Sequence, residues 1–142
     1  YKDVDRVAAF IAELKEFEAK GEFPQFITLR LGNDHTSGLV ANRLSPKAQV
    51  ADNDYALGQL VEAMSRSKFW AKTAIFVLED DAQNGADHVD SHRSPAYVIS
   101  PYTRRAAVDS TFYNTTSMLR TMELLLGMRS MTVYDSAATP MT

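Results

Sequence analysis

The chain gathers acidic and imidazole side chains in two stretches that could hold a metal ion. The longer stretch, 78–93, contains Asp80 and Asp81 directly after Glu79, together with two of the chain's three histidines. The shorter stretch carries Asp34 and His35 side by side. Carboxylates a few ångströms apart repel one another unless a cation or a proton lies between them. Because Asp and His are ligands of hard and borderline divalent cations, both stretches indicate a metal site.

Simpler interpretations of these residues stay open. An acidic stretch can be a solvated loop in which Asp and Asn form turns. A histidine that follows an aspartate closely, such as His92, is often part of a surface hydrogen-bond pair. The sequence has no Gly-x-Ser-x-Gly nucleophile elbow and no cysteine, so it offers no evident nucleophile. Its arginines Arg93, Arg104 and Arg105 could hold an anion by bidentate bonding, although solvent exposure or pairing with carboxylates explains them as well.

Three amphipathic patterns predict the helices that must position these residues. Apolar residues recur at helical spacing from Val4 to a terminating Gly21. A second helix is predicted from Asp52, as its N-cap, to about Ser67. The last helix is predicted around Met118–Leu126, with Asn114 or Thr115 at its cap and Gly127 at its end. The segment 37–50 has no clear period and is predicted to be irregular.

Three strands are predicted, at Phe26–Leu31, which is rich in β-formers, and at the short apolar runs Ala74–Leu78 and Ala96–Ser100. Wholly apolar runs suit strands that are covered on both faces, as in a parallel sheet. The order of elements predicts an α/β fold, a layered α/β/α arrangement with a mostly parallel sheet and a right-handed crossover. In such a sheet ligands bind at the carboxyl ends of the strands. We therefore expect the two acidic stretches, and all three histidines, to meet at one sheet edge.

Length and composition restrict the classes of protein to consider. A chain of 142 residues with 45% hydrophobic and 23% charged residues suits one globular domain, so we predict a single α/β domain over 1–142. The net charge of −3 gives no basic surface for a nucleic acid. No apolar run approaches the roughly 20 residues of a membrane-spanning helix. The sequence does not indicate an oligomeric state.

Four segments, in order, resemble the phosphoesterase branch of the alkaline phosphatase superfamily, which includes bacterial phospholipase C and acid phosphatase enzymes. The matching segments are Leu31-Gly32-Asn33-Asp34-His35-Thr36, Asp80-Asp81 followed by Gly85 and Asp87-His88-Val89, Val98-Ile99-Ser100-Pro101-Tyr102, and Thr116-Ser117-Met118-Leu119-Arg120-Thr121-Met122-Glu123. The resemblance implies an alkaline phosphatase-like fold of which this chain is a part. The nucleophilic Ser or Thr of that branch precedes the first matching segment. We therefore expect the chain to be the C-terminal portion of a catalytic domain.

The resemblance also implies an activity and a role for each matching residue. It implies a metal-dependent hydrolase of phosphate esters, acting on phosphomonoesters, phosphodiesters or phospholipid head groups. Asp34, Asp80 and Asp81 would be metal ligands, and His35 and His88 would be catalytic residues in the same pocket. The cofactor would be a divalent ion, with Zn, Mn, Fe and Ca all compatible with Asp and His ligands. Relatives in this branch are commonly exported.

A second hypothesis comes from another class of protein. The chain would then be a non-catalytic α/β binding or interaction module that retains the acidic sheet edge. Hydrolysis of a phosphate ester that depends on a bound metal distinguishes the two hypotheses.

Overall fold

The computed structural model describes residues 2–80 and 94–141, which belong to two compact units, Tyr1–Ala74 and Ile75–Thr142. The described elements include both helices and a small sheet, so the prediction of an α/β fold is confirmed at that level. The single-domain prediction for 1–142 stays a prediction. None of the described helices has the combined length and hydropathy to cross a membrane.

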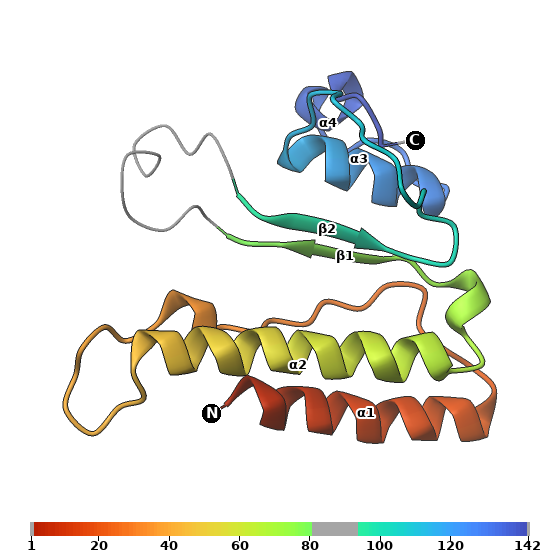
Figure 1. Ribbon diagram of the computed structural model, residues 1–142. Helices are drawn as coiled ribbons and strands as arrows, with labels where there is room; N and C mark the ends of the chain where they lie inside the picture. Colours follow the sequence, from red (N-terminus) through yellow and green to blue (C-terminus); the bar gives the residue numbers. More distant parts are fainter. Residues whose placement is uncertain (1, 81–93, 142) are drawn as a thin grey trace. The chain divides into compact units, whose positions relative to one another are not determined.

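The first unit contains two long helices, α1 (Asp3–Lys20) and α2 (Pro46–Arg66), that pack side by side and run in the same direction (Figure 1). The connecting segment therefore returns along the helices before α2 begins. One apolar face of each helix forms the core of the unit. The buried apolar side chains are Val7, Phe10, Leu14, Ala56, Leu60 and Met64.

The ends of the two helices follow from their capping residues. As predicted, α1 ends at Gly21, which adopts the left-handed conformation with φ of 79°. The predicted start of α2 at Asp52 is wrong, because the helix begins six residues earlier in the sequence, at Pro46. Ser45 is its N-cap and accepts a hydrogen bond from the Ala48 N–H, and proline is favoured in a first turn. Part of the segment predicted to be irregular is therefore helical.

The strand predicted at Phe26–Leu31 is wrong, since this segment has no regular secondary structure. A β-strand requires a hydrogen-bonded neighbour, and no described segment pairs with it. The segment ends in a short 3₁₀ turn, η1 (Asn33–His35), which carries two of the predicted site residues. A second 3₁₀ turn, η2 (Trp70–Lys72), follows α2.

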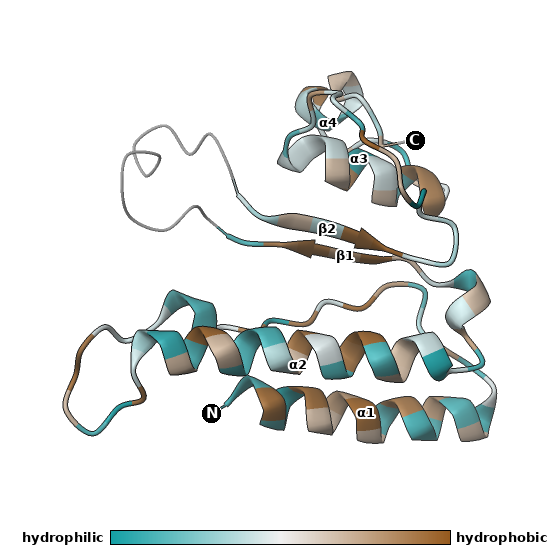
Figure 2. Ribbon diagram, viewed as in Figure 1, coloured by the Kyte–Doolittle hydropathy of each residue, from teal (hydrophilic) through white to brown (hydrophobic). Residues whose placement is uncertain are grey.

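The second unit contains a two-stranded antiparallel sheet of β1 (Ile75–Leu78) and β2 (Ala96–Ile99), with Ile75 opposite Ile99. Figure 2 shows the apolar character of both strands. The prediction of a mostly parallel sheet with a crossover is therefore wrong for the described residues. A parallel pair needs a crossover connection, usually helical, whereas the sequence between these strands is polar and lacks helical periodicity.

Two helices complete the second unit and contact one another, α3 (Thr115–Leu125) and α4 (Val133–Ala137). The predicted last helix is confirmed, with Asn114 as its N-cap. The Asn114 side chain accepts a hydrogen bond from the Ser117 N–H, and the Ser117 hydroxyl accepts one from the Asn114 N–H. The five-residue α4 was not predicted, because it is too short to show a helical period.

Candidate functional site

The buried carboxylate of Asp3 holds the segment that leads into η1. Asp3 is the first residue of α1 and its side chain is 1% exposed. Its two oxygens accept hydrogen bonds from the Gly32 N–H, at 3.0 Å, and from the Asn33 N–H, at 2.8 Å. The backbone before the site residues is therefore fixed by an anionic group at the start of a helix, in a charge-assisted interaction.

Two polar residues of α2 complete this network. Asp52 Oδ2 accepts hydrogen bonds from the Asp3 N–H at 2.8 Å and from Asn33 Nδ2 at 2.6 Å. Asn53 Nδ2 donates to Asp3 Oδ2 at 3.0 Å and lies 3.5 Å from Asp34 Oδ1. The start of α1, the middle of α2 and η1 are thus joined through side chains, so the helix pair determines where η1 lies.

The predicted site residues Asp34 and His35 lie next to this network on η1. Asp34 is half-buried, and the Asn53 amide is its hydrogen-bond partner among the described residues. His35 is exposed, and its Nδ1 lies 3.3 Å from the Thr36 carbonyl oxygen. A carbonyl can only accept, so Nδ1 is the donor and Nε2 carries the lone pair of the neutral ring. The turn therefore offers a carboxylate and an imidazole nitrogen to a ligand.

The acidic stretch begins in the second unit at the end of the antiparallel strands. The pairing extends past β1, because the Glu79 N–H donates to the Pro95 carbonyl at 3.1 Å and the Ser94 hydroxyl donates to the Glu79 carbonyl. The next residue, Asp80, is exposed. The predicted site residues Asp81 and His88 lie outside the described residues.

The prediction that both stretches share one cation stays a prediction. Asp34 and His35 belong to the first unit and Asp80 belongs to the second. Within 2–80 and 94–141, no group of three or more His, Asp or Glu side chains is arranged to hold a metal ion. The donor chemistry at η1 does suit such an ion, since a carboxylate beside an imidazole oriented by a backbone carbonyl is a common arrangement of metal ligands.

Sequence reasoning did not identify the residues that position η1. Asp3 was not recognised, and Asp52 was interpreted as a helix cap. Their hydrogen bonds join residues 19 to 50 positions apart, which a local pattern does not reveal. The available signal was the adjacent pair Asp52 and Asn53 within an amphipathic helix, since polar side chains on a buried helix face need partners there.

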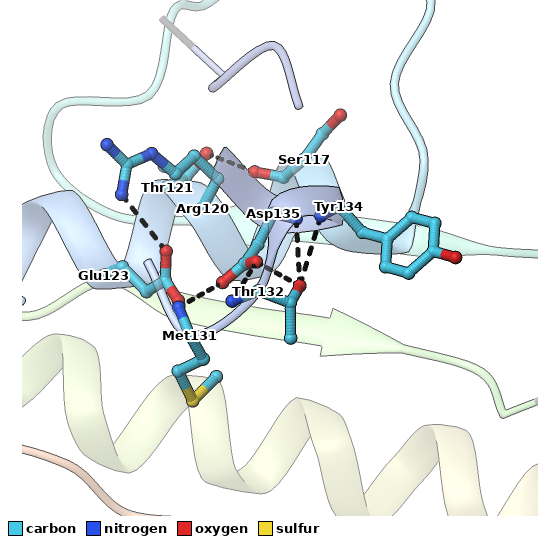
Figure 3. A network of polar contacts seen from close by, with 8 residues as sticks. All are labelled: Ser117, Arg120, Thr121, Glu123, Met131, Thr132, Tyr134 and Asp135. Atoms are coloured by element: carbon cyan, nitrogen blue, oxygen red, sulfur yellow. Dashed lines mark hydrogen bonds and ion pairs between the residues drawn. The ribbon is translucent and has the colours of Figure 1, made fainter. Parts of the chain in front are cut away.

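A second buried polar network lies in the second unit, between α3 and α4 (Figure 3). The Asp135 side chain is 0% exposed and accepts hydrogen bonds from the Met131 N–H, the Thr132 N–H and the Thr132 hydroxyl. Glu123 is also buried; its Oε2 pairs with Arg120 Nη1 at 3.2 Å, and its Oε1 has no hydrogen-bond partner among the described residues. The hydrogen bond from the Thr132 hydroxyl is the main reason that the pKa of Asp135 lies well below its ordinary value of 3.8.

This lowered pKa predicts a loss of stability in acid. A carboxyl whose pKa is lower in the folded state stabilises the fold fully above its unfolded pKa, and the contribution disappears as the pH falls toward the folded pKa. The stabilisation by Asp135 is therefore complete well above its ordinary pKa of 3.8 and decreases progressively as the pH falls below that value. We expect the melting temperature of Asp135→Asn to fall less between about pH 6 and about pH 2 than that of the unchanged chain.

The exposed Asp54→Asn is the matched control and should retain the full acid dependence. Equal slopes of melting temperature against pH in Asp135→Asn and in the unchanged chain would contradict the role of Asp135.

Comparison with known proteins identifies one match. A family model described as the Phosphoesterase family matches residues 3–129, which is most of the chain. Neither the curated proteins nor the solved structures give a significant match. The matched range begins at the buried Asp3 and includes η1, both strands and α3.

Proposed function

The chain belongs to the Phosphoesterase family, and on that premise we propose that it is part of a metal-dependent hydrolase of phosphate esters. The observation that supports this proposal best is the arrangement at η1. There, Asp34 and the Nε2 of His35 are offered by a turn that the buried Asp3 holds in place. A turn held in place in this way suits catalysis, because the backbone that bears the two donors need not be reordered during the reaction.

Asp34, Asp80 and Asp81 hold a divalent metal ion, one of Zn, Mn, Fe or Ca. Such an ion neutralises phosphoryl charge and lowers the pKa of a coordinated hydroxyl or water. His35 and His88 are the catalytic residues that hold or transfer protons. For His35, the bond from Nδ1 to the Thr36 carbonyl leaves Nε2 as the atom that accepts a proton.

The proposed substrates are phosphomonoesters, phosphodiesters or phospholipid head groups. Hydrolysis proceeds through a hydroxyl nucleophile, which the resemblance to phospholipase C-like and acid phosphatase-like enzymes assigns to a Ser or Thr before the first matching segment.

A non-catalytic binding module is the second candidate. It is favoured by one observation, namely that protein groups already satisfy the Asp3 and Asp52 carboxylates through hydrogen bonds. Asp3 and Asp52, two of the acidic residues near η1, therefore have a structural role. In such a module the acidic residues would serve binding alone.

Metal removal tests the proposed function. The natural full-length protein and the 142-residue chain are assayed with a chromogenic phosphomonoester and a chromogenic phosphodiester. We expect the full-length protein to hydrolyse at least one of them, a chelator to abolish the activity, and one of the four metals to restore it. Activity that survives chelation would exclude metal dependence. Absence of turnover with every ester and metal would support the binding module.

A further inference from the structure

A polar cleft of about 380 Å³ lies beside η1 in the first unit, lined by Asp3, Arg6, Arg30, Gly32 and Asn33. Its position is informative because Asn33 is the first residue of the turn that carries Asp34 and His35. None of the roles proposed above uses its two arginines.

The charges that line the cleft favour an anion. Arg6 Nε lies 3.6 Å from Asp3 Oδ1, and the Arg6 side chain stays 47% exposed. The Asp3 carboxylate already accepts hydrogen bonds from the backbone N–H groups of residues 32 and 33 and from Asn53. The lining therefore carries two guanidinium groups and a single carboxylate, whose charge is largely satisfied by other donors.

Arg30 reaches the cleft across Gly32. Its Nε lies 4.0 Å from the point where a Cβ on residue 32 would be, so the guanidinium passes close to the glycine backbone. Arg30 is exposed, and among the described residues no carboxylate pairs with it. Its planar donor groups are therefore available for bidentate bonding to an oxyanion.

We propose that Arg6 and Arg30 form an anion-binding subsite that holds a second anionic group of the substrate, a phosphate or a carboxylate beyond the scissile ester. The assignment of the bound anion to the substrate rests on the proposed function. The binding of an anion in the cleft does not depend on it. The cleft adjoins η1 at Asn33. A substrate whose second anionic group is bound in the cleft would therefore have its reacting phosphoryl group near Asp34 and His35.

Inorganic phosphate is the probe for binding alone. The full-length protein is labelled with ¹⁵N in its arginines, and the Nε–H signals are followed by NMR as phosphate is added. We expect saturable shifts of the Arg6 and Arg30 signals, and an affinity roughly 10-fold weaker in Arg30→Gln. Arg30→Lys keeps the charge without the bidentate geometry, so its phosphate affinity should lie between that of the unchanged protein and that of Arg30→Gln.

Arg43→Gln is the matched control, since Arg43 is an exposed arginine of the same unit that does not line the cleft. Its phosphate affinity should equal that of the unchanged protein. Equal affinities in Arg30→Gln and Arg43→Gln, or the absence of shifts at Arg6 and Arg30, would overturn the subsite whatever the enzymatic activity.

Enzyme kinetics tests whether the anion bound by Arg6 and Arg30 is a group of the substrate. The ratio of kcat/KM for 4-carboxyphenyl phosphate to that for 4-carbamoylphenyl phosphate compares an anionic with a neutral group on similar esters. We expect Arg30→Gln to lower this ratio about 10-fold, and Arg43→Gln to leave it unchanged. An unchanged ratio in Arg30→Gln would overturn the assignment to a substrate group. Phosphate binding without hydrolysis of any ester would refute the proposed function and leave an anion-binding cleft.

Discussion

Replacing Asp34 with asparagine is expected to lower kcat/KM for phosphoester hydrolysis by about 100-fold or more and to reduce the bound metal. The substitution removes a negative charge and one ligand oxygen while it keeps the size of the side chain. The contact with Asn53 is long, at 3.5 Å, so its loss should affect stability little. Steady-state kinetics and metal analysis of the purified full-length protein measure both effects.

Asp54→Asn is the matched control, because Asp54 is an exposed aspartate of the same unit, on α2. It should retain both activity and metal. The same loss is expected for Asp80→Asn and Asp81→Asn if all three carboxylates hold the ion. Unchanged turnover and metal content in Asp34→Asn would show that η1 provides no ligand.

Replacing Asp3 with alanine is expected to destabilise the first unit by about 3 kcal/mol, the largest effect on stability that we predict. The change leaves the backbone N–H groups of Gly32 and Asn33 without their acceptor, and it removes the partner of Arg6. Urea unfolding measures the loss of stability. Hydrogen exchange at the two amides should become faster in Asp3→Ala, even below the unfolding transition.

Asp5→Ala provides the control, since Asp5 also lies in the first turn of α1 but is exposed. Its effect should stay below about 1 kcal/mol, the usual size of a charge–dipole interaction. In Asp3→Asn one carboxylate oxygen is replaced by an NH₂ group, which cannot accept a hydrogen bond from the backbone N–H that it faces. Much of the destabilisation expected for Asp3→Ala should therefore persist in Asp3→Asn. An Asp3→Ala chain as stable as Asp5→Ala would show that the network does not fix η1.

The sequence predicted those elements whose limits are set locally. The first helix was identified because its apolar spacing runs without interruption to Gly21, and the last because Asn114 is a recognisable cap. The start of α2 was missed because Asp52 has the chemistry of a cap, although it bonds the N–H of Asp3 instead. A residue type that suits two environments does not reveal which one it occupies.

Pairing between distant segments was the part that the sequence did not reveal. The run Phe26–Leu31 has the composition of a strand but has no partner among the described residues, since strand formation depends on a neighbour as well as on propensity. Both apolar runs of the second unit are strands, but their direction depends on the connection between them. For the site, the donors at Asp34 and His35 were identified, whereas the residues that hold them were not.

The hydrogen bonds of Asp3 have a consequence for the order of events during folding. They connect positions separated by 29, 30, 49 and 50 residues. Interactions so distant along the chain carry a large loop-closure entropy, whereas each helix can nucleate from neighbouring residues alone. The turn that bears Asp34 therefore becomes rigid only after the two helices have docked, and a partly collapsed intermediate would have its helices before it acquired a ligand-ready geometry.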